Sequence, residues 1–134
     1  MKVLIADESS LVRECLAALV SEIRGVELVG QAGDAYEALE TIQRLRPDVV
    51  ILDVRMPGGN GIRVLEAIKK STAAPVVIML AAFPYPQYRK KCLEVGADYF
   101  FDKSTEFDRV VQVLRKMRDN TTGESASIPD SGLQ

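Results

Sequence analysis

Val49-Val50-Ile51-Leu52-Asp53 is a run of apolar residues that ends on a carboxylate. An uninterrupted apolar run of this length is typical of a parallel strand that helices cover on both faces. Four similar runs, at residues 2–6, 26–32, 75–80 and 97–101, predict four more strands. Between them, apolar residues recur at helical spacing. This alternation predicts an α/β fold of five strand–helix units, with a doubly wound parallel sheet and helices on both faces.

Residues that start or stop helices support this division. Ser9 or the serine after it can cap the first helix, and Gly25 is expected to end it. Asp34 and Glu37 have the spacing of a capping box at the start of the second helix. Ser104 can cap the last helix. The helices are therefore expected to fill the intervals between the strands.

Length and composition predict one soluble domain. The chain has 134 residues, of which 47% are apolar, enough for one domain with a sizeable core. We expect this domain to span residues 1–118 and residues 119–134 to form a polar, disordered tail or linker stub. No apolar run approaches the ~20 residues that cross a bilayer, and no secretory signal precedes the first strand, so we expect a cytoplasmic location without membrane contact.

Charge and residue types exclude several kinds of chemistry. The net charge of −2 does not favour direct binding of nucleic acid. The chain has no histidine, which excludes a histidine general base and histidine-ligated zinc. Cys15 and Cys92 occupy apolar positions of helical patterns, and we expect both to be reduced thiols in or near the core.

Charged residues follow three of the predicted strands. Asp7 and Glu8 follow the first strand, Asp53 ends the third, and Lys103 follows the fifth. The carboxyl ends of parallel strands form one crevice, so we expect these side chains to converge there. Repelling carboxylates favour a cation among them, and an all-oxygen ligand set suits Mg²⁺. An aspartate can attack phosphorus and a lysine can hold phosphate oxygens, so the pattern predicts phosphoryl transfer.

Three segments of the chain are similar to a known protein family. They are the acidic pair Asp7-Glu8, the segment Asp53-Val54-Arg55-Met56-Pro57-Gly58 with Gly61, and the segment Gly96-Ala97-Asp98-Tyr99-Phe100-Phe101-Asp102-Lys103. In this order and at these separations, the three resemble the receiver domains of two-component response regulators. The resemblance covers roughly residues 1–118. It implies a flavodoxin-like fold with the strand order 2-1-3-4-5.

The resemblance also implies a role for each residue of the site. Asp53 is implied as the phosphoacceptor for a phosphohistidine on a sensor histidine kinase or phosphotransfer protein. Glu8 and Asp53 would bind Mg²⁺ directly, Asp7 through water, and Arg55 through its backbone carbonyl. Lys103 would hold a phosphoryl oxygen. The implied function is a phosphorylation-dependent switch of protein–protein interactions, with self-phosphorylation and self-dephosphorylation as its only reactions.

Two residues depart from the family pattern. Ala81 stands where the family usually has the Thr or Ser that donates a hydrogen bond to the phosphoryl group. Ser104 follows the lysine where proline is usual, and we expect a trans bond before it, because a cis bond before a residue other than proline costs ~2.5–4 kcal/mol. Phe100 aligns with the switch aromatic. We therefore expect a weakened switch, and a phosphorylation-independent (pseudo-receiver) interaction module remains the alternative.

The resemblance places partner docking on the face made by the fourth helix, fifth strand and fifth helix. The fourth helix carries Tyr88, Arg89, Lys90 and Lys91, which we expect to contribute to a surface for a downstream protein or a second copy of the chain. Leu11, Val12 and Cys15 begin the first helix beside the site, and the resemblance implies that a partly exposed one of them meets a kinase helix, without indicating which.

Two enzyme-like or cofactor-binding alternatives fit the sequence less well. A Mg²⁺-dependent phosphatase with an aspartyl-phosphate intermediate normally has a second aspartate two residues after the nucleophile, where this chain has Arg55. A flavin-binding flavodoxin would have to accept a phosphate beside the acidic pair Asp7-Glu8. The glycines after Pro57 are interpreted as shaping a turn, since the Gly-x-x-x-x-Gly-Lys phosphate loop is absent. No DNA-reading or catalytic output element is recognisable, so we expect a stand-alone receiver or one cut from a longer regulator.

Overall fold

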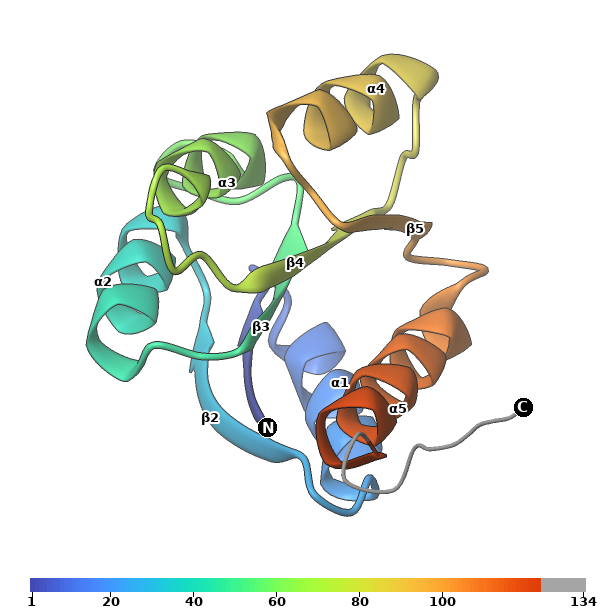
Figure 1. The fold of residues 1–134 in the computed structure, drawn as a ribbon. Coiled ribbons are helices and arrows are strands. Elements are labelled where there is room, and N and C mark those ends of the chain that lie inside the picture. The colour runs from blue at the N-terminus through green and yellow to red at the C-terminus, as the bar shows by residue number, and fades with distance from the viewer. Residues whose placement is uncertain (124–134) are drawn as a thin grey trace.

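The computed structural model describes residues 1–123, which alternate between strand and helix (Figure 1). The strands are β1 (Lys2–Ala6), β2 (Glu27–Ala32), β3 (Val49–Asp53), β4 (Val76–Ala81) and β5 (Tyr99–Asp102). The helices are α1 (Ser10–Ser21), α2 (Ala35–Leu45), α3 (Gly61–Lys69), α4 (Pro86–Val95) and α5 (Phe107–Gly123). The strands form one parallel sheet in the order β2-β1-β3-β4-β5, which confirms the expected topology.

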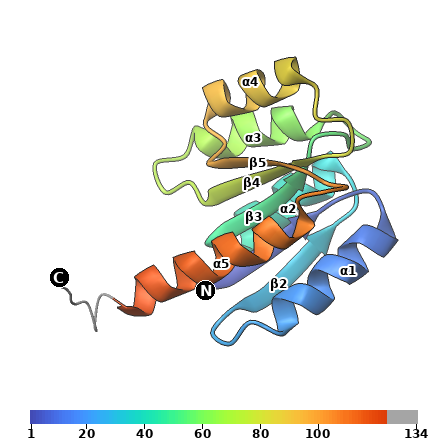
Figure 2. The ribbon, with the colours of Figure 1, turned by 90° about the vertical axis from the view of Figure 1, so that its right-hand side faces the viewer.

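The two faces of the sheet carry separate hydrophobic clusters, because successive residues of a strand point to opposite sides. On β3, Leu52 belongs to the cluster under α2, α3 and α4, whereas Ile51 belongs to the cluster under α1 and α5. Figure 2 shows α3 and α4 on one side of the sheet and α1 and α5 on the other. This coverage explains why β3 is buried along its whole length and reads as an uninterrupted apolar run.

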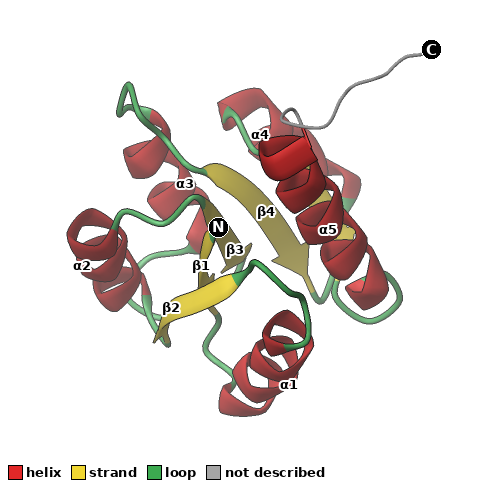
Figure 3. Ribbon diagram, turned by 60° about the horizontal axis from the view of Figure 1, so that its bottom comes forward, coloured by secondary structure: helices red, strands yellow, loops and turns green. Residues whose placement is uncertain are grey.

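The strand register brings the carboxyl ends of the central strands level with one another. Ala6 of β1 pairs with Leu52 of β3, and Asp53 pairs with Leu80 of β4. The loop that leaves β1 leads to α1 on one side of the sheet, whereas the loops that leave β3 and β4 lead to α3 and α4 on the other; Figure 3 shows these loops in green. The residues directly after β1, β3 and β5 therefore meet at one edge.

The start of α2 shows how local sequence sets a helix boundary. The Asp34 side chain accepts a hydrogen bond from the Glu37 backbone N–H at 2.8 Å, as the predicted capping box requires. The Glu37 carboxylate accepts from the N–H of Gly33, one residue before the cap, at 2.8 Å. Both ends of the box thus satisfy backbone donors that the helix itself leaves unpaired.

Three predicted boundaries differ from the structure. Helix α1 ends at Ser21, and Gly25, with φ of 85°, lies in the turn that follows. Ser104 does not cap α5, which begins at Phe107, because its N–H and hydroxyl bond to Asp102 instead. Helix α5 continues to Gly123, past residue 119, where a polar tail was expected to begin. The remainder of that predicted tail, residues 124–134, lies outside the described residues.

The two cysteines have different environments. Cys92 is the buried residue of α4, and burial raises the pKa of its thiol to about 11, which makes it a core thiol as expected. Cys15 is exposed on α1, so its placement in the core was wrong: it lies at the edge of the apolar stripe of that helix. Among the helices of residues 1–123, none has the length and apolar character needed to span a membrane.

Candidate functional site

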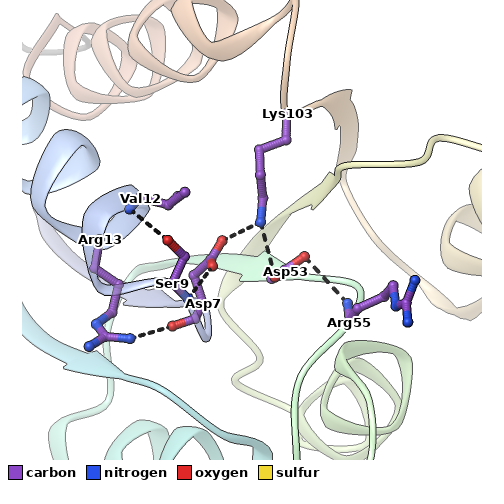
Figure 4. A network of polar contacts seen from close by, with 7 residues as sticks. All are labelled: Asp7, Ser9, Val12, Arg13, Asp53, Arg55 and Lys103. Carbon is purple, nitrogen blue, oxygen red and sulfur yellow. Dashed lines mark hydrogen bonds and ion pairs between the residues drawn. The ribbon is translucent and has the colours of Figure 1, made fainter.

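The first element of the site is the end of β1, where Asp7 is held by the backbone around it. Asp7 is 1% exposed, and its N–H donates to the Ala32 carbonyl at 3.0 Å. Its Oδ1 accepts from the Ser9 N–H at 2.9 Å, and Ser9 in turn caps α1 by accepting from the Val12 N–H. Arg13 Nη1 donates to the Asp7 carbonyl at 2.6 Å (Figure 4). These contacts leave Asp7 Oδ2 free to face the centre of the site.

The second element is the end of β3, where Asp53 is 5% exposed. Asp53 Oδ1 accepts from the Arg55 N–H at 3.3 Å, and the Val54 N–H donates to the Leu80 carbonyl at 2.9 Å. Gly61 closes the loop after Asp53: its N–H donates to the Val54 carbonyl at 2.8 Å, and a Cβ on Gly61 would lie 1.9 Å from the Asp53 carbonyl oxygen. This close approach gives Gly61 the turn-shaping role that was predicted.

Lys103 joins these two carboxylates from the loop after β5. Its Nζ lies 2.6 Å from Asp7 Oδ2 and 3.0 Å from Asp53 Oδ2 (Figure 4). Its backbone N–H donates to the Ala81 carbonyl at 2.9 Å, which ties the loop to the end of β4. The structure therefore brings together three of the four charged side chains that were expected to converge.

The electrostatics of the site follow from burial and from this ion pairing. Burial raises the pKa of Asp53 above its ordinary value, the negative charge of Asp7 raises it further, and Lys103 opposes both effects. For Lys103, burial alone would lower the pKa, but the contacts with Asp7 and Asp53 raise it above the ordinary value. Lys103 is therefore a firmly charged ammonium between two carboxylates that compete for it.

Glu8 is not brought into this cluster. Glu8 is exposed, and with Arg55 and Tyr88 it lines a pocket of about 510 Å³ between the β3–α3 loop and α4. Successive residues at the end of a strand point in opposite directions, so a buried Asp7 turns Glu8 outward. Within residues 1–123, no three acidic, cysteine or histidine side chains are gathered closely enough to hold a metal ion. The two buried carboxylates share an ammonium instead.

The end of β4 and the aromatic residue of β5 form an apolar side of the site. Ala81 is 2% exposed, and Phe100 is 4% exposed. Arg89 of α4 reaches back over Phe100, with its guanidinium carbon 5.8 Å from the ring centroid, and Arg89 Nη1 donates to the Phe100 carbonyl at 3.2 Å. Phe100 is thus packed inward and covered by a cation, which the sequence pattern did not predict.

The residues expected to form a partner surface lie together on α4. Lys90 and Lys91 are exposed, and Tyr88 is half-buried with its ring edge-on to Tyr85, at a centroid distance of 5.6 Å. Phe83 stacks on Tyr85 and is 53% exposed. Arg89 differs from the two lysines because its guanidinium bonds to β5. This surface therefore combines the exposed aromatic rings of Phe83 and Tyr85 with the exposed Lys90 and Lys91.

Sequence reasoning missed Arg13, and a signal for it exists. Arg13 lies four residues after Ser9, which places it one helical turn beyond the cap and on the same side of α1. From there it reaches the Asp7 carbonyl, as Figure 4 shows. A basic residue one turn into the helix after an acidic strand end is thus a usable sign of such a contact.

The arrangement suits chemistry on a phosphoryl group. Asp53 offers a buried carboxylate oxygen that can act as a nucleophile, and Lys103 offers a point charge that can neutralise phosphoryl oxygens. Phosphoryl transfer depends mainly on positioning and on neutralising charge, and both are available here. A second carboxylate from Asp7 adds an oxygen donor for a cation.

A protein-family model and a curated relative match most of this chain. The family model described as "Response regulator receiver domain" matches residues 3–115. The chain is 33% identical over 118 residues to "Sensory transduction protein LytT" of Bacillus cereus, covering 88% of this chain and 47% of that protein. The chain thus spans less than half the length of this curated relative.

Two solved structures share the fold. The signal receiver domain of the putative response regulator NarL from Mycobacterium tuberculosis superposes with a TM-score of 0.81 at 30% identity, covering 88% of this chain and 95% of that one. A CheX-CheY-BeF3-Mg²⁺ complex from Borrelia burgdorferi contains a chain that superposes with a TM-score of 0.73 at 30% identity, covering 85% and 89%. Together with the strand order and the site, these matches establish that the chain belongs to the receiver domain family of two-component response regulators.

Proposed function

We propose that this receiver domain accepts a phosphoryl group on Asp53 and uses it to change its interactions with other proteins. The observation that carries the proposal is the placement of the Lys103 ammonium 3.0 Å from the buried Asp53 carboxylate. A structural salt bridge needs one carboxylate, whereas here a second one, Asp7, is buried at the same ammonium. Burying two carboxylates against one ammonium is unfavourable unless the site serves a further purpose.

The proposed reaction is a transfer between nitrogen and oxygen. A carboxylate oxygen of Asp53 forms a bond to the phosphorus of a phosphohistidine, the P–N bond breaks, and its electron pair stays on the imidazole nitrogen of the donor. Lys103 stays beside the phosphoryl oxygens and neutralises part of their charge. Asp7, held in place by Ser9 and Arg13, keeps the ammonium oriented before the donor arrives.

The proposed cofactor is Mg²⁺, and the donor atoms suit it. Within residues 1–123, Asp7 Oδ2 is buried and accepts no hydrogen bond of regular geometry, and the Lys103 ammonium lies 2.6 Å from it. We propose that Asp7, Asp53 and the backbone carbonyl of Arg55 hold the ion, with the exposed Glu8 completing the set. When bound, Mg²⁺ would neutralise the incoming phosphoryl charge. The Mg²⁺ named for the similar Borrelia complex supports this assignment.

A docking place for the phosphodonor lies on the side of the site formed by α1. A mostly apolar pocket of about 430 Å³ is lined there by residues of α1, of the β5–α5 loop and of α5, and it includes Lys103 itself. Leu11, at its edge, is 68% exposed. We propose that a helix of the sensor kinase or phosphotransfer protein covers Leu11 while its phosphohistidine reaches Asp53.

The output surface is proposed on the α4–β5–α5 face, with Tyr88, Lys90 and Lys91 as contact residues for a downstream protein or a second copy of the chain. The exposed rings of Phe83 and Tyr85 support this choice, because aromatic residues are enriched at protein interfaces. The cytoplasmic location, the absence of direct nucleic-acid binding and the absence of any reaction beyond self-phosphorylation and self-dephosphorylation stay predictions.

A second candidate function is favoured by the apolar side of the site. Ala81 offers no hydroxyl to a phosphoryl group, and Phe100 is already packed inward beneath Arg89. A domain in this arrangement has less to change on phosphorylation, since a ligand shifts a conformational equilibrium only by its differential affinity. The alternative is therefore a phosphorylation-independent interaction module that keeps the receiver fold.

Intact mass spectrometry separates the two candidates. The protein is incubated with Mg²⁺ and phosphoramidate or acetyl phosphate, with Asp53→Ala as the matched control. A gain of one phosphoryl group by the wild type and no gain by the variant supports the phosphoacceptor. No gain by either protein, together with no Mg²⁺ binding in a separate titration, supports the phosphorylation-independent module.

A further inference from the structure

The loop after β5 is organised around the carboxylate of Asp102. Asp102 Oδ1 accepts from the Ser104 backbone N–H at 2.8 Å and from the Ser104 hydroxyl at 2.7 Å. Ser104 is the residue that departs from the family pattern, where proline is usual and neither donor exists. Both donors of Ser104 are used here. Ser104 therefore helps to fix the conformation of the loop and is not merely a polar residue in the place of proline.

Further hydrogen bonds lock the backbone on both sides of Lys103. The Asp102 N–H donates to Glu106 Oε1 at 2.9 Å, and the Glu106 N–H donates to the Asp102 carbonyl at 2.9 Å. The Lys103 N–H donates to the Ala81 carbonyl at 2.9 Å. Lys103 therefore lies between two residues whose side chains bond to each other, while its own side chain points inward and is 15% exposed.

We propose that Asp102 and Ser104 are positioning residues that hold the Lys103 ammonium between Asp7 and Asp53. A lysine side chain is long and flexible. The backbone conformation at Lys103 sets the direction in which this side chain leaves the loop, and so which groups its ammonium can reach. If the turn between Asp102 and Ser104 opened, the Lys103 side chain could follow the loop outward into solvent. For the phosphoryl reaction, this inference rests on the proposed function, whereas the placement of Lys103 itself can be tested without it.

In this proposal Asp102 acts as a hydrogen-bond acceptor within the turn, and its negative charge does not act on Lys103 directly. The Ser104 hydroxyl and N–H lower the pKa of Asp102 below its ordinary value. The ion pairs of Lys103 Nζ, in contrast, are with Asp7 and Asp53. An asparagine at position 102 keeps the acceptor oxygen and removes the charge. Asp102→Asn should therefore preserve the turn, and Asp102→Ala should lose it.

Site-resolved lysine acylation tests the placement of Lys103. Asp102→Ala, Asp102→Asn and wild-type protein are treated briefly with an amine-acylating reagent, and peptides are quantified by mass spectrometry. Lys69 is the internal control, since its Nζ is paired with Asp98 at 2.9 Å and its side chain is 19% exposed. We expect several-fold faster labelling of Lys103 in Asp102→Ala, wild-type labelling in Asp102→Asn, and no change at Lys69. Equal Lys103 labelling in all three proteins would overturn the proposal.

A second variant covers the case in which Asp102→Ala loosens the whole fold, which would raise labelling at Lys69 as well. Ser104→Ala removes the hydroxyl donor and keeps the backbone N–H, so we expect a smaller rise in labelling at Lys103 alone. If Ser104→Ala then leaves Lys103 at the wild-type rate, the positioning role is excluded.

The initial rate of phosphorylation by phosphoramidate gives a readout that a purely structural role would not move. It should fall several-fold in Asp102→Ala at unchanged stability to urea and recover in Asp102→Asn. If the wild type takes up no phosphoryl group, the proposed function fails and the labelling result alone decides the positioning role. If the wild type is phosphorylated and Asp102→Ala matches it, the positioning role fails and the proposed function stands.

Discussion

Lys103 Nζ lies 2.6 Å from Asp7, which is closer than the 3.0 Å that separates it from Asp53. Lys103 thus pairs with Asp7 Oδ2, a buried oxygen that accepts no regular hydrogen bond within residues 1–123 and that we propose as an oxygen donor to Mg²⁺. Asp53, which keeps the longer contact, has a raised pKa. The site is therefore arranged around its own ammonium, and we expect the proposed binding of Mg²⁺ to compete with that ammonium.

Replacing Lys103 should strengthen Mg²⁺ binding and slow phosphorylation. In Lys103→Met the competing ammonium is gone, and since a unit charge about 4 Å away contributes about 1 kcal/mol even in bulk water, we expect at least roughly fivefold tighter binding. The initial rate with phosphoramidate should fall, because no side chain then neutralises the phosphoryl oxygens. Isothermal titration with Mg²⁺ and a mass-based rate measurement check both effects. Lys69→Met, which removes a lysine paired with Asp98, is the matched control, and weaker Mg²⁺ binding by Lys103→Met would contradict the competition.

Removing the charge of Asp53 should stabilise the metal-free protein at neutral pH. Burial and the charge of Asp7 raise the pKa of Asp53 from its ordinary value of 3.8. The folded state of such a carboxyl binds its proton more tightly than the unfolded state, so stability is lost as pH rises from 3.8 through the raised pKa. Asp53→Asn escapes this loss.

Urea unfolding at several pH values measures this effect. We expect Asp53→Asn to unfold at higher urea than the wild type at pH 7.5 without Mg²⁺, and the difference to shrink as the pH falls toward that ordinary value. A lower midpoint for Asp53→Asn at pH 7.5 would show that the pairing with Lys103 outweighs burial and repulsion.

A methyl group on Gly61 should disrupt the site by displacing the backbone of Asp53. The added Cβ would lie 1.9 Å from the Asp53 carbonyl oxygen, which is backbone of the central strand and cannot rotate away. We expect Gly61→Ala to cost about 3 kcal/mol or more of unfolding free energy, at the upper end for overpacking. Gly33→Ala is the control, since its nearest neighbour is a side-chain atom, Arg13 Nη1 at 3.2 Å, which has to give by only a few tenths of an ångström. Equal stabilities of the two variants, measured in urea, would exclude the close approach.

Restoring a hydroxyl at position 81 should strengthen the response to a phosphoryl group. Ala81 is buried at the end of β4, and a hydrogen bond to a charged group is worth ~1.5–3 kcal/mol. With Ala81→Thr, beryllofluoride should therefore shift more backbone amide resonances, and shift them further, than it does in the wild type. Identical amide spectra of the two proteins in the presence of beryllofluoride would show that the missing hydroxyl does not limit the switch.

The features that could be predicted from the sequence are those encoded by neighbouring residues. The apolar run that ends on Asp53 predicted both the central strand and the carboxylate at its end. A few neighbouring residues are enough to indicate a buried strand and the position where it stops. The topology followed from the family resemblance, and the structure confirms it. The convergence of Asp7, Asp53 and Lys103 followed from the same rule and is present.

The features that could not be predicted depend on tertiary distances or on competition between partners. Glu8 was expected in the cluster, but its neighbour Asp7 takes the inward position and leaves it exposed. Ser104 has the identity of a helix cap, and the nearby Asp102 carboxylate captures both of its donors. Arg89 belongs to a basic run typical of a solvated face, and its contact with Phe100 arises only because α4 packs beside β5.

Chemical trapping identifies the residue that carries the phosphoryl group and thereby tests whether Asp53 is the phosphoacceptor. Protein treated with phosphoramidate and Mg²⁺ is reduced with borohydride, which converts an aspartyl phosphate to homoserine, and its peptides are sequenced by mass spectrometry. We expect homoserine at position 53, dependent on Mg²⁺ and strongly reduced in Lys103→Met. Homoserine at another acidic residue, or none while Mg²⁺ is bound, would contradict it.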